Sequence, residues 1–329
     1  MVRQLTRGLL PALCCLIYLS PNGKQDVLQA EELRPASDTT STPGVKGYRD
    51  IVIFKDRYFA VGSDGRIDCI SQSGEKVTAN SSTAYTLNCA YANEDILVVA
   101  GDHGTVSYSS DGRIFDHAET QTVENINGIT SMAGTILACA DNGMILISND
   151  GKVWNSIHTA AEGNIVSLSA GPSFFMGVTD VGEILKSSDG IQWEISDYNK
   201  EYAGYNKPAK FRKVLIANNS IVIIGTHDDG SPAILCSTLG NVWAERIPLY
   251  HDEHGMIKYL EQKPNGITYD PVMDEFVLSC DNGELFSLPS CSKCNKFLKV
   301  SDSNFKAVLY AGDCLLIAGD NYSFFIQKL

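Results

Sequence analysis

The sequence lacks the short motifs that mark several classes of enzyme. It has no nucleophile elbow of the Gly-x-Ser-x-Gly type, no glycine-rich phosphate loop and no His-Glu-x-x-His zinc motif. These patterns hold a nucleophile, a phosphate or a catalytic zinc ion in a fixed geometry. Their absence argues against the hydrolases and nucleotide-dependent enzymes that rely on them.

Positive charge is also scarce. The 329 residues include 26 Lys and Arg against 39 Asp and Glu, giving a formal net charge of −13, and no basic cluster stands out. Affinity for nucleic acids depends on contacts between basic side chains and phosphates. We therefore expect no nucleic-acid partner.

Long apolar runs are missing as well. The clearest one, Gly8–Leu19, has 12 residues, whereas a membrane-spanning helix needs about 20. Because Arg3 and Arg7 precede this run, residues 1–20 are predicted to be a signal peptide. We expect residues 21–46 to form a leader and the mature chain, without a transmembrane segment, to be secreted, periplasmic or on the cell surface.

Helical periodicity is nearly absent, and a repeat takes its place. Four glycines recur every 39 residues, steps of 48 and 53 follow, and the last turn is Gly319–Tyr322. Each copy contains short β-rich runs bounded by Asn-Gly or Asp-Gly turns, which predicts a four-stranded antiparallel meander. Repeats of this length and strand number indicate a β-propeller. We predict an all-β, monomeric, seven-bladed propeller over residues 47–329. The six glycines of these turns are Gly65, Gly104, Gly143, Gly182, Gly230 and Gly283.

The seventh copy is short. After Tyr322 only one run, Ser323–Leu329, remains, so blade seven lacks its outer strand. We expect an N-terminal strand within Gln25–Leu33 to complete this blade and close the ring, which would leave no unpaired edge. The alternative is a disordered leader, as the acidic, Ser/Thr/Pro-rich composition of residues 31–46 favours.

A second motif, Ser-x-x-Gly-x-x-aromatic, occupies the turn before the outer strand in four copies. Ser and Asp side chains can bond to the backbone of their own turn, and the aromatic ring can pack back on the hairpin. The motif resembles the Asp-box, or bacterial neuraminidase repeat, of sialidases, sortilin-type receptors and photosystem II assembly-factor propellers. In those families the box is structural and lies opposite the ligand site. The matching residues are Ser109, Asp111, Gly112, Phe115, Ser148, Asp150, Gly151, Trp154, Ser187, Asp189, Gly190, Trp193, Ser237, Gly240 and Trp243.

In copy six, two cysteines replace this motif. Cys291 takes the glycine position and Cys294 the aromatic position. A pair on a hairpin turn does not suit a thioredoxin-like site, and zinc would need two more ligands. We expect a disulfide between the two, with free thiols or metal and redox chemistry as the alternatives. No metal or cofactor is predicted.

An acidic residue recurs in the first turn of every copy. A ring of carboxylates near a central channel could bind a cation, but Asp is also a preferred residue of such turns. A position that is used in all copies favours the structural role. The residues are Asp64, Asp102, Asp141, Asp180, Asp229, Asp281 and Asp320.

Two insertions break the repeat, in Tyr198–Pro208 and in residues 248–259. Both connect an outer strand to the next inner strand, so we expect them on one face around blades four to six. Loops on a rigid scaffold often bind ligands, and tyrosine suits recognition surfaces. We predict a non-enzymatic scaffold that binds a protein or glycan there, against the alternative of solvated loops. The candidate residues are Tyr198, Tyr202, Tyr205, Tyr250, His251, His254 and Tyr259.

Two other functions compete with this interpretation. Arg49 and Arg212 lie at the starts of inner strands, where the carboxylate-binding arginines of sialidases would lie, and we count them as binding candidates. No third inner-strand arginine is present, and seven blades are one more than sialidases have. The remaining alternative is a structural surface protein without a specific ligand.

Overall fold

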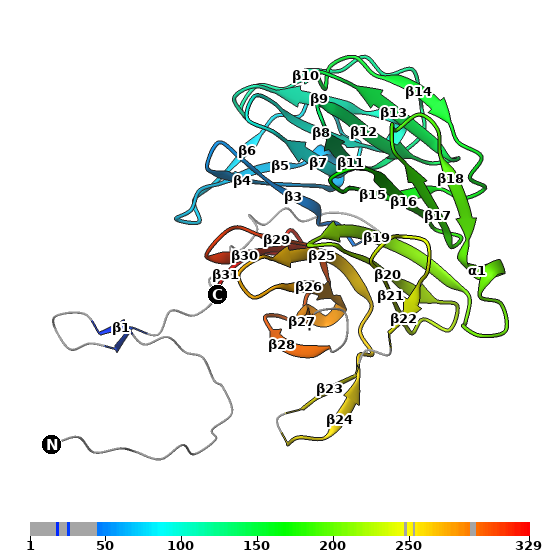
Figure 1. The fold of residues 1–329 in the computed structure, drawn as a ribbon. Coiled ribbons are helices and arrows are strands. Elements are labelled where there is room, and N and C mark those ends of the chain that lie inside the picture. The colour runs from blue at the N-terminus through cyan, green and yellow to red at the C-terminus, as the bar shows by residue number, and fades with distance from the viewer. Residues whose placement is uncertain (1–17, 20–24, 27–44, 247–248, 253, 290–293) are drawn as a thin grey trace, which may run out of the picture.

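The structure, a computed structural model, describes residues 18–19, 25–26, 45–246, 249–252, 254–289 and 294–329. Seven antiparallel sheets follow one another in chain order around a common centre (Figure 1). The predicted all-β, seven-bladed propeller is therefore confirmed. Among the described residues, no helix is long and apolar enough to cross a membrane.

Each blade begins with an inner strand at the centre and continues outward. The inner strands are β3 (Tyr48–Phe54), β7 (Leu87–Ala92), β11 (Ile126–Met132), β15 (Ile165–Ala170), β19 (Ala209–Ala217), β25 (Pro264–Asp270) and β29 (Phe305–Tyr310). The second strands are β4 (Arg57–Gly62), β8 (Leu97–Gly101), β12 (Thr135–Ala140), β16 (Phe175–Thr179), β20 (Ser220–His227), β26 (Glu275–Cys280) and β30 (Cys314–Gly319).

The third and fourth strands complete the blades. The third strands are β5 (Ile67–Ile70), β9 (Val106–Ser109), β13 (Met144–Ser148), β17 (Glu183–Ser187), β21 (Pro232–Ser237), β27 (Glu284–Pro289) and β31 (Phe324–Lys328). The outer strands are β6 (Lys76–Ala79), β10 (Asp116–His117), β14 (Asn155–His158), β18 (Glu194–Asp197), β22 (Ala244–Glu245) and β28 (Asn295–Lys299). Three short 3₁₀ turns, Ser63–Gly65, Asp102–Gly104 and Asp281–Gly283, follow second strands.

The core lies between neighbouring blades. Second strands such as β8 and β12 read as continuous apolar runs and are buried almost throughout, because each sheet is covered on both faces by its neighbours. One cluster joins Val98 of blade two to Ile136 and Trp154 of blade three. This packing fixes the blades against one another and so holds the loops at their ends in place.

The predicted closure strand within Gln25–Leu33 is described only at residues 25–26. Blade seven has three strands in the described part of the chain, and Gln25–Asp26 (β2) pairs with Tyr18–Leu19 (β1) instead of β31. Residues 27–33 lie outside the described residues. In the described part of the chain, blades one and seven pack side by side: Asn321 N donates to Lys46 O at 2.7 Å, and the ring of Tyr48 packs edge-on against Tyr322 with centroids 5.3 Å apart.

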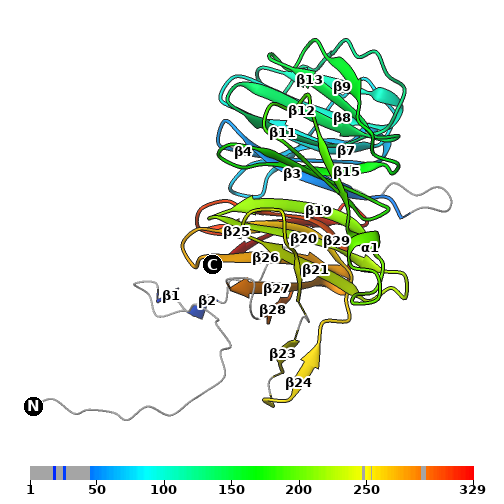
Figure 2. The same cartoon turned by 45° about the vertical axis from the view of Figure 1, so that its right-hand side comes forward.

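The second insertion contains no helix in its described part. It forms a two-stranded hairpin, β23 (Leu249–His251) and β24 (Ile257–Tyr259). Figure 2 shows this hairpin projecting from the body of the propeller. The first insertion forms a one-turn helix, α1 (Tyr198–Glu201), whose first turn is capped by the side chain of Asp197.

Candidate functional site

A β-bulge near the start of every inner strand builds the entrance to the central channel. The register of each inner strand shifts by one residue there. Bulges commonly redirect a side chain, and all seven bulged residues line one hollow of about 630 Å³. They are Arg49, Asn88, Asn127, Val166, Arg212, Asn265 and Lys306.

In three blades the bulged residue is an asparagine that connects two blades. Asn88 Nδ2 donates to Asp102 Oδ1 of its own blade at 2.9 Å and to Ile126 O of the next blade at 3.2 Å. Asn127 and Asn265 make the corresponding pairs of bonds. The three asparagines therefore have a structural role.

The same contacts explain the recurring acidic residues. Asp102, Asp141 and Asp281 accept from these asparagines, and Asp180 and Asp320 accept from asparagines just before the inner strands. Asp64 and Asp229 pair with Lys46 and Lys207. The described residues contain no group of three side chains arranged to hold a metal ion. These contacts favour the structural role over a cation site.

In three other blades the bulged residue is basic. Arg212 of blade five, Lys306 of blade seven and Arg49 of blade one line the hollow together with Lys210 and Lys213. Lys306 Nζ lies 3.8 Å from a carboxylate oxygen of each of two turn aspartates. The basic bulged residues come from blades five, seven and one, with Asn265 of blade six between them, and Asp180 of blade four is the acidic residue in the lining. The five basic side chains leave the hollow with an excess of positive charge, which attracts anionic ligands.

The carboxylate of Asp50 lies near Lys213 and Lys306. Asp50 accepts from the backbone of Ala90 in the next blade at 3.0 Å and from Ile51 N at 2.9 Å. Burial raises the pKa of Asp50, while the charge of Lys213 acts in the opposite direction. Sequence reasoning found Arg49 and Arg212 but missed Lys213 and Lys306. Alignment of the repeats would have identified Lys306, because it places Lys306 at the same position of its blade as Arg49.

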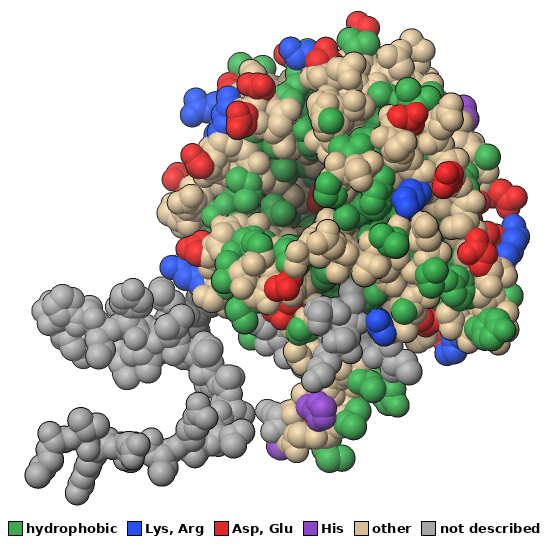
Figure 3. Space-filling model, in the orientation of Figure 1, with side chains coloured by type: hydrophobic (Ala, Val, Ile, Leu, Met, Phe, Trp, Pro, Cys, Tyr) green, Lys and Arg blue, Asp and Glu red, His purple; other side chains and the backbone are tan. Residues whose placement is uncertain are grey.

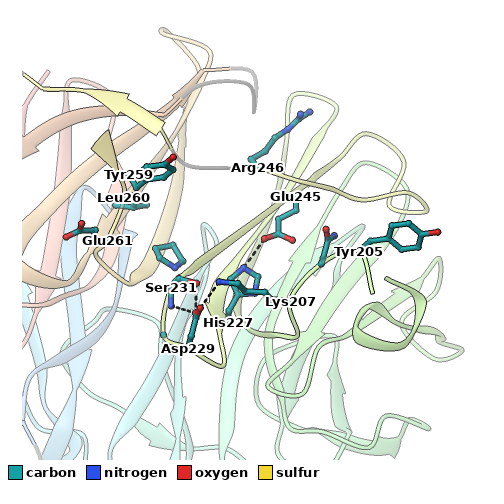
Figure 4. A pocket seen from close by; sticks show the side chains of 13 residues that line it. Tyr205, Lys207, His227, Asp229, Ser231, Glu245, Arg246, Tyr259, Leu260 and Glu261 are labelled. Carbon is teal, nitrogen blue, oxygen red and sulfur yellow. Dashed lines mark hydrogen bonds and ion pairs between the residues drawn. The ribbon is translucent and has the colours of Figure 1, made fainter. Parts of the chain in front are cut away.

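The two insertions meet at a second hollow, a cleft of about 830 Å³ beside blade five (Figure 4). Tyr205 and Lys207 come from the first insertion, and Tyr259 comes from β24 of the second. Figure 4 shows His227, Asp229 and Glu245 between them. Because Thr226 lines the channel entrance and the next residue, His227, lines the cleft, the two hollows are neighbours.

Charged residues at the bottom of the cleft are paired. His227 is buried, with Nε2 2.8 Å from Glu245 Oε1 and Nδ1 3.2 Å from the carbonyl oxygen of Pro208. Glu245 Oε2 accepts from the hydroxyl of Tyr198 at 3.1 Å. At the surface, the hydrogen bond from Lys207 to Asp229 at 2.6 Å lowers the pKa of that carboxyl. The cleft therefore offers exposed aromatic rings above a fixed polar base.

The candidate tyrosines divide into two kinds. Tyr198 is 1% exposed and stacks on Tyr202 at 4.8 Å, so it is a core residue and not a ligand contact. Tyr202 is half-buried, and its hydroxyl accepts from Trp243 N at 3.0 Å, which anchors the insertion to blade five. By contrast, Tyr205 is 89% exposed and Tyr259 is 62% exposed.

The other candidates lie on the hairpin. Tyr250 packs edge-on against Phe286 of blade six at 5.4 Å and is half-buried. His251 and His254 are exposed, and neither is among the residues that line the cleft. The structure thus separates these three residues from Tyr205, whereas the sequence placed them in one group.

The serine-containing turns share one geometry in blades two to four. In blade two, Ser109 Oγ accepts from Gly112 N at 2.8 Å, and Asp111 Oδ1 accepts from the backbone of Arg113 and Ile114 at 2.8 and 3.1 Å. Successive strands of a blade run in opposite directions, so the turn between the third and the outer strand lies at the opposite end of the blade from the connection between the outer strand and the next inner strand. The serine-containing turns therefore lie on the face opposite the cleft. Their identity as Asp-boxes stays a prediction. In blade five the Gly240–Ser237 bond is kept at 2.8 Å, with Leu239 in the position of the aspartate.

The expected disulfide between Cys291 and Cys294 is wrong. Cys294 is a free, buried thiol, whereas Cys236 of blade five is disulfide-bonded. Cys291 lies outside the described residues. Burial raises the pKa of Cys294 to about 12, and its neighbours in the core include Leu288 and Phe286. Cys294 takes the position of the buried aromatic residue and serves as a small apolar side chain.

No family model and no curated protein matches the chain. Several solved structures have a similar fold. YCF48 bound to D1 peptide superposes with a TM-score of 0.66 at 15% identity, covering 92% of this chain and 98% of that one. YCF48 from Cyanidioschyzon merolae also gives 0.66, at 10% identity over 92% and 99% of the chains. The WD40 propeller domain of Doa1 gives 0.61 at 10% identity over 87% and 94%. At these identities, the likeness supports the fold alone.

Proposed function

We propose that the chain is a non-enzymatic scaffold that binds an extended segment of a partner protein on the face that holds the cleft. One observation carries the proposal: the two insertions that interrupt the repeat contribute to the same cleft, with exposed Tyr205 and Tyr259 from one insertion each. Exposed aromatic rings beside fixed polar groups are typical of recognition surfaces.

The charges around the cleft indicate the chemistry of the segment. Lys207 lines the cleft and Lys210 lines the channel entrance; both are more than half exposed, and each pairs with an aspartate, Asp229 and Asp228 respectively. A segment that leaves the cleft toward the channel entrance meets Arg212 and Lys213. We therefore expect the partner to carry carboxylates on the part that reaches the channel. Among similar folds, YCF48 has been solved with a D1 peptide, which supports a peptide as the ligand class.

A glycosidase is the less favoured function. Two arginines, Arg49 and Arg212, line the channel entrance, and the third basic bulged residue is Lys306. A lysine is a point charge and does not form the paired contact that arginine makes with a carboxylate. Turnover of a chromogenic sialoside that is lost in Arg212→Ala would favour the enzyme.

We also expect the protein to be exported and monomeric. Mass measurement of the protein recovered from its host would identify a missing N-terminal segment, and sedimentation would give the oligomeric state.

The binding proposal is tested with peptides selected from a phage library of random ten-residue sequences. Peptides enriched on the full chain are expected to bind Tyr205→Ala at least about tenfold more weakly, since one lost hot-spot contact amounts to 1.4 kcal/mol or more. The matched control is Tyr85→Ala, which removes an exposed tyrosine that packs against His103 outside the cleft. Equal loss in both variants would contradict the assignment.

A further inference from the structure

The β23–β24 hairpin has two unlike faces. Its pairs are Leu249 with Tyr259, Tyr250 with Lys258, and His251 with Ile257. Paired residues share a face and successive residues alternate. Tyr250 therefore faces Phe286 of blade six.

The opposite face of the hairpin is exposed and mostly apolar. It presents Leu249, Ile257 and Tyr259, which are 38%, 61% and 62% exposed, together with exposed His251, and Met256 at the turn is also exposed. Figure 3 shows green apolar atoms gathered on this projection, beside purple histidine. Apolar side chains grouped on a projecting element indicate a contact surface.

One edge of the hairpin is also open. Asp252 N donates to Met256 O at 2.9 Å, which makes these two residues a hydrogen-bonded pair. Hydrogen-bonded and non-bonded pairs alternate along antiparallel strands, so the N–H and C=O groups of Ile257 and Tyr259 point away from β23. No other described strand pairs with β24. Unpaired edge groups of this kind are a template for another strand.

The hairpin turn is held in shape before any partner binds. Asp252 Oδ1 accepts from the backbone nitrogens of His254 and Met256 at 3.0 and 2.9 Å. Gly255 has a φ of +74°, a left-handed conformation that favours glycine. Because the edge is already ordered, less conformational entropy is lost when a partner binds.

We propose that β24 is a docking edge, to which an extended segment of a partner protein adds as a third strand of the β23–β24 sheet. This inference rests on the proposed function and names its mode of recognition. The partner strand carries alternating apolar side chains that cover Ile257 and Tyr259, and its backbone bonds to the open groups of the same two residues. A two-stranded hairpin gains stability from a third strand.

Continuity with the cleft selects this occupant. Tyr259 belongs both to the exposed face of β24 and to the lining of the cleft, and the next residues, Leu260 and Glu261, also line it. A strand paired with β24 is therefore led into the cleft. A second copy of the chain fits less well. If two β24 strands paired antiparallel with Ile257 opposite Tyr259, Lys258 of one copy would lie opposite Lys258 of the other. Like charges that face each other across a strand pair are unfavourable.

The test uses the library-selected peptides and the full chain. Hydrogen exchange is measured by NMR at the amides of Ile257 and Tyr259, with and without peptide. We expect fast exchange in the free protein and at least about tenfold slower exchange in the complex. A second readout leaves the protein unchanged: N-methylation of alternate peptide residues removes donors from one strand edge only, so one methylated series loses about tenfold or more in affinity and the other does not.

A surface variant adds a third readout. Ile257→Asp should weaken peptide binding, whereas Val272→Asp, at an exposed apolar residue of a turn in blade six, should not. If peptides bind and depend on Tyr205 but leave both amides exchanging freely, the docking edge is wrong and the proposed function stands. If no peptide is enriched, both fail. Exchange at the two amides is also measured without peptide, at high protein concentration and with phosphatidylcholine vesicles. If self-association or the vesicles slow this exchange, the assignment of β24 to a partner peptide is wrong.

Discussion

The imidazole of His227 lies 2.8 Å from the carboxylate of Glu245, at the bottom of the cleft formed by the two insertions. His227 ends β20, and Glu245 ends β22 of the same blade. Glu245 also accepts from Tyr198 of α1. This carboxylate therefore joins the blade to the first insertion and sets the position of the loop that carries Tyr205.

Removing this carboxylate should loosen the cleft. Glu245→Ala leaves His227 Nε2 and the Tyr198 hydroxyl without their acceptor, and buried polar groups without partners cost about 1–3 kcal/mol each. We expect a lower thermal midpoint and weaker peptide binding together. Glu245→Gln, which keeps an acceptor, should have the smaller effect. Unchanged unfolding in Glu245→Ala would show that the contact does not anchor the insertion.

The asparagines at the bulges should contribute to stability. Asn127→Ala removes bonds to Asp141 and to Ile165 O of the next blade. We expect a loss of about 1–2 kcal/mol in the free energy of unfolding, measured with denaturant. The control is Asn149→Ala at an exposed turn position, where the change should stay within about 0.5 kcal/mol. Equal effects of the two substitutions would contradict the connecting role.

The serine-containing turns offer a matched pair of adjacent serines. Ser187 Oγ accepts from Gly190 N at 2.8 Å and is buried, while Ser188 is exposed. Ser187→Ala should destabilise the protein by about 1–2 kcal/mol because it leaves a buried amide without its acceptor. Ser188→Ala should be nearly neutral. Thermal unfolding measures both, and neither variant should change peptide affinity, since this turn lies opposite the cleft.

Acid should weaken a hydrogen-bonded cluster in blade one that holds Tyr48, the residue that packs against Tyr322 of blade seven. Burial alone would raise the pKa of Asp68, but hydrogen bonds from Thr78, Tyr48 and Arg66 together hold it below its usual value. A folded-state pKa below the unfolded value of about 3.9 stabilises the protein above that pH, and the stabilisation is lost as the pH falls through the folded pKa.

Denaturant unfolding of wild type and Asp68→Asn between pH 7 and pH 2 measures this contribution. We expect the difference in the free energy of unfolding between the two proteins to be largest near neutral pH and to shrink below pH 4. A difference that is independent of pH would contradict the role of the ionised carboxylate.

The sequence was sufficient for the fold because the glycine step repeats along the chain. Gly65, Gly104 and Gly143 all have positive φ in the structure, as the turn prediction required. It was not sufficient for ring closure. The contact between Tyr48 and Tyr322 joins the two ends of the propeller, and no local pattern encodes a pairing at that separation.

The site was predicted in part. Residue type alone could not separate Tyr198, which is buried, from Tyr205, which is exposed, since both occur in one polar insertion. The spacing between Cys291 and Cys294 cannot distinguish a disulfide from a free thiol, and Cys294 fills the position of the buried aromatic residue as a free thiol. The role of Lys306 depends on the bulge that turns it toward the channel, as for Arg49, and the strand pattern alone does not reveal such a bulge.

The most direct test of the account is the affinity of a library-selected peptide for three proteins: wild type, the double variant Tyr205→Ala with Tyr259→Ala, and Tyr85→Ala. Isothermal titration provides the three dissociation constants. The account predicts a loss of about a hundredfold in the double variant, on the order of two hot-spot contacts, and none in Tyr85→Ala. Equal affinity for all three proteins would contradict a binding site between the two insertions.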